Sequence, residues 1–200
     1  MRTERRVPAR RPHAEAGMTL IELLVGIAIL AVVVATLTTI LISSTHQGSQ
    51  TSRRADVQGG CRQAISLMAT EIRQAGADPS IPPVGVVGIV SADSASVHIR
   101  ADLNGDGVIQ TVEPSEDVTY SYDPVQHTVK RDPGTGPVAI LSNVTAMNLT
   151  YYDNTNTQIL PQPLSATDAA RVTTIRISLT ASEGDSSPIT LNTTVNLRNR

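Results

Sequence analysis

Oxygen-bearing side chains recur at alternate positions in one stretch of the sequence, DLNGDGVIQTVE at residues 102–113. The stretch fits the calcium-loop pattern D-x-D/N-x-D/N-G-x5-E, in which hard oxygen donors wrap around a Ca²⁺ ion and a final Glu closes the site. Gly107 occupies the sharp turn of the pattern, and Val108 would bind through its carbonyl oxygen. The ligand positions are Asp102, Asn104, Asp106, Val108, Gln110 and Glu113. The sequence therefore predicts a calcium site in this loop.

The same loop also fits a plain hairpin turn. Asn-Gly and Asp-Gly pairs favour tight turns, and the flanking sequences are typical of strands, whereas an EF-hand has helices on both sides. If calcium binds, we expect a dissociation constant on the order of 10⁻⁴ to 10⁻³ M, as in weak extracellular sites. The role of the ion would then be to order the loop, and both interpretations stay open.

Other residues that could support catalysis lack a recognisable spacing. The four histidines form no metal-binding or triad pattern, and the sequence contains no G-x-S-x-G elbow, H-E-x-x-H motif or phosphate-binding glycine loop. We therefore expect no enzyme. The chain also has no Phe or Trp and only four Tyr, which disfavours nucleic-acid binding through aromatic stacking. The single cysteine, Cys61, has no second cysteine with which to form an intrachain disulfide.

A carboxylate of another kind lies near the N-terminus, where Glu22 is the only charged residue between Met18 and Ile42. A helix of this segment would be about 37 Å long, enough to span a hydrocarbon core of about 30 Å. An ionised carboxylate in lipid costs several kcal/mol, so such residues usually have a function. The segment therefore predicts a membrane helix in which Glu22 needs a partner.

The charges on either side of this segment predict its orientation. Residues 1–17, the leader, contain five Arg and two Glu, whereas the rest of the chain is acidic overall. By the positive-inside rule the leader lies in the cytoplasm and the residues after about Ser43 lie across the membrane. A cleaved secretory signal would have a shorter apolar core of about 7–15 residues. An ordinary signal anchor fits the length but gives no reason for Glu22.

Cleavage between Gly17 and Met18 would give Glu22 a partner. It would create a free α-amino group at Met18, four residues before Glu22 and on the same helical face. The amine could come from the same chain or from a packed neighbour. In a neighbour it would fix one stagger of adjacent helices, because only one register brings the amine to the carboxylate.

The basic leader ending in Gly17, followed by MTLIELLVGIAIL, closely resembles the type III signal of type IV pilins and type II secretion pseudopilins. The resemblance implies cytoplasmic cleavage after Gly17 by a prepilin peptidase and N-methylation of Met18. It also implies that Glu22 guides entry of the subunit into a growing filament. The family usually has Phe at the first mature position, where this chain has Met18.

The remaining sequence predicts an α+β, pilin-like fold. Residues 43–76 continue the helix, with a kink or loosened turn at Gly59-Gly60 and an end set by Gly76 and Pro79. The helix carries one apolar stripe, Cys61, Ala64, Ile65, Met68, Ile72 and Ala75. Residues 77–200, the head, contain short β-rich runs joined by turn sequences, which predicts an antiparallel sheet packed on the helix. Those runs are VGVVGIV, ASVHIRA, DVTYSYD, HTVKRD, PVAIL, NVTAMNLTYYD, RVTTIRISLTAS and ITLNTTVNLRN.

Several functions fit this organisation. The closing strand pair ending in VNLRNR resembles minor pilins of the PilW type and J-type pseudopilins, so we expect a structural pilin at or near a pilus tip. The expected partners are other pilins, the prepilin peptidase and the bacterial inner membrane. A type II secretion pseudopilin is the nearest alternative. A membrane-anchored calcium- or ligand-binding module would keep its leader and tolerate loss of Glu22. An anchored periplasmic enzyme would have a cleft with convergent titratable groups.

Overall fold

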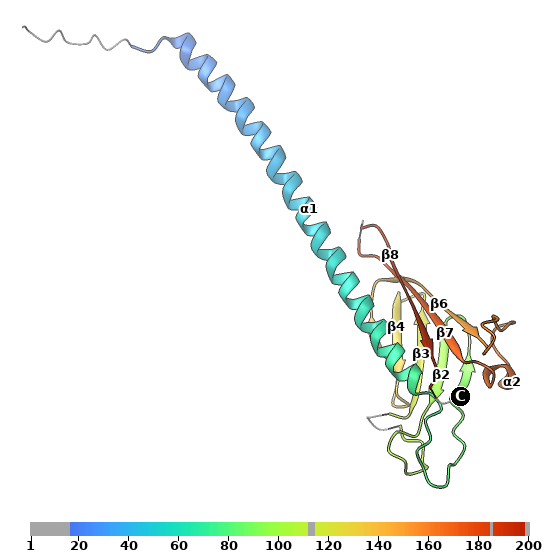
Figure 1. The fold of residues 1–200 in the computed structure, drawn as a ribbon. Helices are drawn as coiled ribbons and strands as arrows, with labels where there is room; N and C mark the ends of the chain where they lie inside the picture. The colour runs from blue at the N-terminus through green and yellow to red at the C-terminus, as the bar shows by residue number, and fades with distance from the viewer. Residues whose placement is uncertain (1–16, 112–114, 185, 199–200) are drawn as a thin grey trace, which may run out of the picture. The chain divides into compact units, whose positions relative to one another are not determined.

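The computed structural model describes residues 17–111, 115–184 and 186–198 (Figure 1). The chain forms two compact units, residues 1–48 and 49–200. Helix α1 (Leu20–Gln74) contributes residues to both units. Among the described residues, it is the one helix that is long and apolar enough to cross a membrane.

In the first unit, the apolar side chains of α1 are exposed on all sides, including Leu24, Ile29 and Leu37. Four threonines of α1 in this unit turn their hydroxyls back onto the helix. Thr36, Thr38, Thr39 and Thr45 donate to carbonyl oxygens three or four residues earlier, at 2.8–2.9 Å. Because these hydroxyls are satisfied within the helix, the segment can enter an apolar environment without unpaired hydroxyl groups.

In the second unit, α1 packs on the strands through the predicted stripe. All six stripe residues, from Cys61 to Ala75, are buried. Helix α1 ends at Gln74, two residues before the predicted bound at residue 76, and Gly76 follows with a φ of 78°, a left-handed conformation that suits glycine. The predicted loosening at Gly59-Gly60 is wrong: α1 runs unbroken through both residues. An added Cβ on Gly60 would lie 3.0 Å from Leu141 Cδ1, so glycine here allows close packing against a strand.

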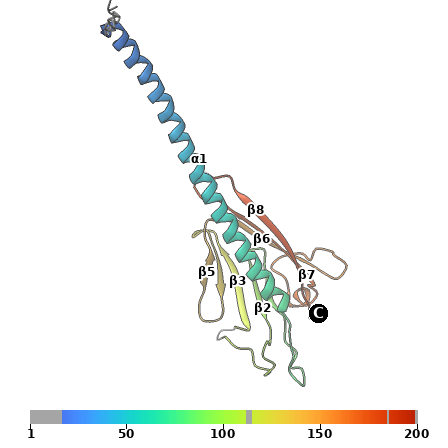
Figure 2. The ribbon, with the colours of Figure 1, turned by 60° about the vertical axis from the view of Figure 1, so that its left-hand side comes forward.

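The strands form two antiparallel sheets, where the sequence predicted one. The larger sheet has the order β1-β2-β3-β4-β5, with β1 (Ile89–Ala92), β2 (Ser96–Arg100), β3 (Asp117–Asp123), β4 (Thr128–Asp132) and β5 (Val138–Leu141). The smaller sheet has the order β6-β7-β8, with β6 (Val144–Tyr152), β7 (Thr174–Ala181) and β8 (Ile189–Asn196). In Figure 2 the C-terminal part of α1 lies between the strands of the two sheets.

One core joins α1 to both sheets. Met68 and Ile72 of α1 pack in the same cluster as Tyr120 of the larger sheet and Ile177 of the smaller sheet. The edge of β6 is covered by the β1–β2 turn, where Leu149 N–H donates to Ser94 O at 2.8 Å.

Two local features differ from the sequence prediction. Residues 84–88 were predicted as part of a strand, but they form a loop in which Asp78 accepts hydrogen bonds from Gly85 N and Val86 N. A short helix, α2 (Ala166–Ala169), was not predicted. Its N-cap is Ser165, whose side chain accepts a hydrogen bond from Asp168 N–H. A helix of four residues is too short to give a recognisable periodic pattern in the sequence.

Gly88 provides a stability test of the junction between helix and sheet. A Cβ at this buried position would lie 2.7 Å from Gly76 N and 2.9 Å from Ala75 C, which are backbone atoms. We expect Gly88→Ala to lower the free energy of unfolding by about 2–3 kcal/mol, because the backbone must shift to relieve the overlap. The measurement is denaturant unfolding of the detergent-solubilised chain.

Gly59→Ala is the matched control, because nothing lies within 4 Å of its added Cβ. Since alanine is the better helix former, this change should raise the free energy of unfolding by about 0.5–1 kcal/mol. Equal free energies of unfolding for Gly88→Ala and Gly59→Ala would contradict the prediction that a side chain at Gly88 overlaps the backbone.

Candidate processing and assembly site

The predicted cleavage site lies just before the helix begins. Gly17, Met18 and Thr19 are outside α1, which starts at Leu20. Gly17 is exposed, Met18 is 75% exposed, and nothing lies within 4 Å of a Cβ placed on Gly17. A non-helical, exposed peptide bond is what a peptidase needs to bind its substrate in an extended form. The geometry therefore suits cleavage between Gly17 and Met18.

Glu22 and Thr19 form a capping box at the start of α1. Thr19 N and Thr19 Oγ1 both donate to Glu22 Oε2 at 2.9 Å, and Glu22 N donates back to Thr19 Oγ1 at 3.3 Å. This reciprocal pattern satisfies backbone N–H groups that have no partner within the helix. Sequence reasoning missed the role of Thr19, although T-L-I-E matches the S/T-x-x-E capping signal.

The capping box holds the Glu22 carboxylate at the end of the helix where cleavage would create an amine. Both donors that Thr19 supplies to the Glu22 carboxylate are uncharged. The first turn of a helix favours a negative charge because of the helix dipole. The site is therefore an anionic group at the head of an apolar helix.

The acidic loop is folded around two buried carboxylates. Asp102 is fully buried, and its two carboxylate oxygens accept from Gly105 N at 2.6 Å and Gly107 N at 2.9 Å. Glu116 is 4% exposed and accepts from Leu103 N at 2.6 Å and Gln110 N at 3.1 Å. Glu116 lies outside the calcium pattern, so sequence reasoning missed it.

Three of the predicted ligand residues lie on the exposed side of this loop. Asp106 accepts from Val108 N at 2.8 Å, from Asn104 Nδ2 at 3.0 Å and from Gln110 Nε2 at 2.7 Å. The bond from the Val108 N–H and those from the two amides lower the pKa of Asp106. Glu113 lies outside the described residues. Within the described ranges, no three His, Cys, Asp or Glu side chains are grouped to hold a metal ion.

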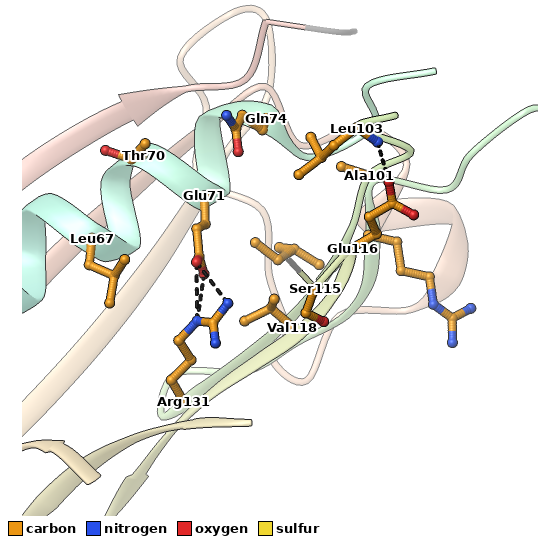
Figure 3. Close-up of a pocket in the computed structure, with 12 residues that line it drawn as sticks. Leu67, Thr70, Glu71, Gln74, Ala101, Leu103, Ser115, Glu116, Val118 and Arg131 are labelled. Atoms are coloured by element: carbon orange, nitrogen blue, oxygen red, sulfur yellow. Dashed lines mark hydrogen bonds and ion pairs between the residues drawn. The ribbon is translucent and has the colours of Figure 1, made fainter. Parts of the chain in front are cut away.

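A pocket of about 300 Å³ lies between α1 and the larger sheet (Figure 3). Arg131 Nε donates to both oxygens of Glu71 at 3.1 Å, and Tyr120 Oη donates to Glu71 Oε2 at 2.5 Å. Burial raises the pKa of Tyr120, and the Glu71 carboxylate raises it further. The carboxylates of Glu71 and Glu116 in this pocket are both engaged in hydrogen bonds that hold the fold together.

Sequence reasoning assigned no role to His98, which the structure pairs with Asp117 across β2 and β3. Asp117 also accepts from Arg100 Nε at 3.0 Å. Partial burial opposes ionisation of Asp117, but the hydrogen bonds from His98 and Arg100 outweigh it and lower the pKa of Asp117.

A lowered carboxyl pKa makes stability depend on pH. The contribution of Asp117 is complete above its unfolded pKa of about 4 and is lost as the pH falls through the lower folded pKa. We therefore expect Asp117→Asn to destabilise the protein at pH 7 and to cost less as the pH falls below about 4. The measurement is urea unfolding of both chains at pH 7 and pH 3. An equal loss of unfolding free energy in Asp117→Asn at the two pH values would contradict the prediction.

Comparison with protein families finds the prokaryotic N-terminal methylation motif at residues 12–38. Comparison with curated proteins finds no match. The motif implies processing by a prepilin peptidase and assembly with other pilins, and the apolar part of α1 fits an inner-membrane anchor. Together with the long N-terminal helix and the antiparallel β-sheets, this motif, which spans residues 12–38, supports a type IV pilin-like protein, and proteins of that kind are generally non-enzymatic structural subunits.

Proposed function

We propose that the protein is a minor type IV pilin that is incorporated at or near the pilus tip and supports pilus assembly. The observation that carries the proposal is the anionic site at Thr19–Glu22, directly after Gly17–Met18 and at the head of an exposed apolar helix. The subunit would first be held in the inner membrane, with its leader in the cytoplasm and its head in the periplasm. The resemblance of the closing strands to PilW-type minor pilins supports the minor role.

The proposed assembly step exchanges lipid for neighbouring helices around residues 18–42. Apolar packing alone allows many staggers, because one apolar surface fits another at several registers. The Glu22 carboxylate meets the methylated amine of Met18 in a neighbouring subunit, and this ion pair selects a single register. A charge pair in an apolar surrounding is strong enough to do so, because an unpaired carboxylate there costs several kcal/mol.

The test of the minor role and tip position is labelling of the filaments. Gold-labelled antibody against residues 77–200 should mark filament ends, at one or a few particles per filament. Label spread evenly along filaments would indicate a major subunit and contradict the proposal. If filaments form normally without the gene and protein export fails instead, the protein is a type II secretion pseudopilin.

We also propose weak calcium binding by the loop that contains Asp102, Asn104 and Asp106. The side chains of these residues each accept a backbone N–H of the same loop, which keeps three oxygen-bearing side chains of the calcium pattern together in one loop. Calcium would replace some of these N–H donors as the partner of the carboxylate oxygens.

Calcium should raise the stability of the unaltered chain and have no effect on a variant without the Asp106 charge. At ten times its dissociation constant, a ligand that binds only the folded state adds about 1.4 kcal/mol. We expect this increment for the unaltered chain in calorimetry with 10 mM CaCl₂ against EDTA, and its loss in Asp106→Asn. Asp132→Asn is the control, because Asp132 also accepts turn N–H groups but lies at the end of β4, away from the acidic loop sequence. Equal melting temperatures of the unaltered chain with and without calcium would contradict the proposal.

A further inference from the structure

Strand β8 has a free edge with backbone groups available for pairing. It is the last strand of the smaller sheet, and within the described part of the chain β7 is its one pairing strand. Just beyond the strand end, Leu197 N–H donates to Thr173 O at 2.9 Å, on the β7 side. Because neighbouring residues of an antiparallel strand bond to opposite sides, the even-numbered residues of β8 direct their N–H and C=O groups outward. These residues are Thr190, Asn192, Thr194 and Asn196.

A hollow of about 380 Å³ runs beside this edge. One wall is the face of α1 from Arg62 to Arg73, and the other is Leu191–Thr193 of β8. A second hollow of about 270 Å³ shares Thr70 and Arg73 with the first and extends to Arg198. The two hollows therefore meet on the helix surface at Thr70 and Arg73, and α1 closes the edge only beyond Asn196, where Arg198 N–H donates to Arg73 O at 3.4 Å.

The charges along these two hollows are all positive. Arg62 and Arg73 line the first hollow, and Arg73 and Arg198 line the second. Among the described residues, the ion pairs involve other cationic side chains and not these three arginines. Strand β8 itself contains no charged residue. An exposed edge strand without charges is normally a site for pairing with another chain.

The spacing of the arginines matches a strand. Arg62 and Arg73 are eleven residues apart, which is close to three helical turns, so they lie on one face about 16 Å apart. An extended chain covers this distance in about five residues. Acidic side chains four residues apart on one face of a strand would lie about 13 Å apart, within reach of both flexible arginines.

We propose that the β8 edge binds an extended acidic segment of another protein, which adds a fourth strand to the smaller sheet. Its backbone bonds the outward groups of Asn192 and Thr194, and its carboxylates pair with Arg62 and Arg73. The charges disfavour a second copy of β8 as the occupant, because β8 offers no carboxylate and its pairing would bring like-charged arginines together. The inference does not depend on the position of the protein in a filament.

The test uses the full chain in detergent and two labelled peptides, Ac-TTETVTET-NH₂ and Ac-TTKTVTKT-NH₂, as probes. Fluorescence anisotropy should show binding of the acidic peptide at low salt, weakened about tenfold or more at 500 mM NaCl, and no binding of the basic peptide. Hydrogen exchange should show new protection in residues 189–196. The double variant Arg62→Glu/Arg73→Glu should reverse the preference and bind the basic peptide.

Thr194→Pro separates strand addition from simple charge attraction. It removes one outward N–H but no β7–β8 hydrogen bond, so the sheet should stay folded. The acidic peptide should then lose its binding, although both arginines remain. Equal binding by this variant, no binding of the acidic peptide to the unaltered chain, or unchanged preference in the double variant would overturn the proposal. Protection of β8 by self-association alone would also overturn it, since the occupant would then be a second copy.

Discussion

Glu22→Ala should reduce incorporation of the protein into filaments by at least about tenfold, which corresponds to about 1.4 kcal/mol of lost pairing energy. The variant keeps the apolar surface of α1 but loses the only charge between Met18 and Ile42. Without that charge, neighbouring helices have no group that distinguishes the correct register from others. The measurement is the amount of the protein in sheared filaments relative to the membrane fraction in the native host.

Thr19→Val is the matched control for this result. It removes the hydroxyl that bonds Glu22 Oε2 and accepts from Glu22 N, but it leaves the charge in place. Loss of a cap costs about 1 kcal/mol of helix stability, which affects only the first turn. Incorporation should therefore stay close to that of the unaltered chain. If the two variants are equally impaired, the role of Glu22 is to cap the helix, and the registry account is wrong.

Arg131→Met should lower the free energy of unfolding by about 2–3 kcal/mol. Arg131 and Glu71 have side chains only 13% and 20% exposed, and they are paired at 2.9 Å. Removing the guanidinium leaves the Glu71 carboxylate in a mostly buried position, where it keeps the hydrogen bond from Tyr120 but has lost its counter-charge. The measurement is denaturant unfolding at pH 7.

A surface pair provides the comparison. Arg171 is 56% exposed and pairs with Asp153 and Asp168 at 3.3 and 3.4 Å. Arg171→Met should change stability by no more than about 0.5 kcal/mol, because exposed ion pairs contribute little in water. The double variant Glu71→Leu/Arg131→Met should recover part of the loss, since no charge is then buried. A similar loss for Arg131→Met and Arg171→Met would show that burial of the first pair is unimportant.

Local patterns predicted most of the elements. The 3.6-residue stripe on α1 and the alternation along β6 and β7 reflect which side chains face one core, so each is visible within its own segment. The division into two sheets is not visible, because it depends on which strands pair across the chain. The loop at residues 84–88 was also missed, since it is held by Asp78, several residues earlier.

The candidate site was predictable to the extent that its signal is local. Gly17, Met18 and Glu22 form a short motif, and Thr19 could have been found from the capping pattern. The pairing of Glu71 with Arg131 joins residues from α1 and β4 that are 60 positions apart, so no sequence spacing reveals it. Glu116 was missed for a similar reason, because its role is to bond backbone groups rather than to follow the calcium pattern.

The most direct test of the pilin-like account is the intact mass of the protein from its native host, with and without the prepilin peptidase. The account predicts a chain that begins at N-methylated Met18 when the peptidase is present and that keeps residues 1–17 when it is absent. A chain that keeps residues 1–17 in both strains would contradict the account, because Glu22 would then have no amine to pair with.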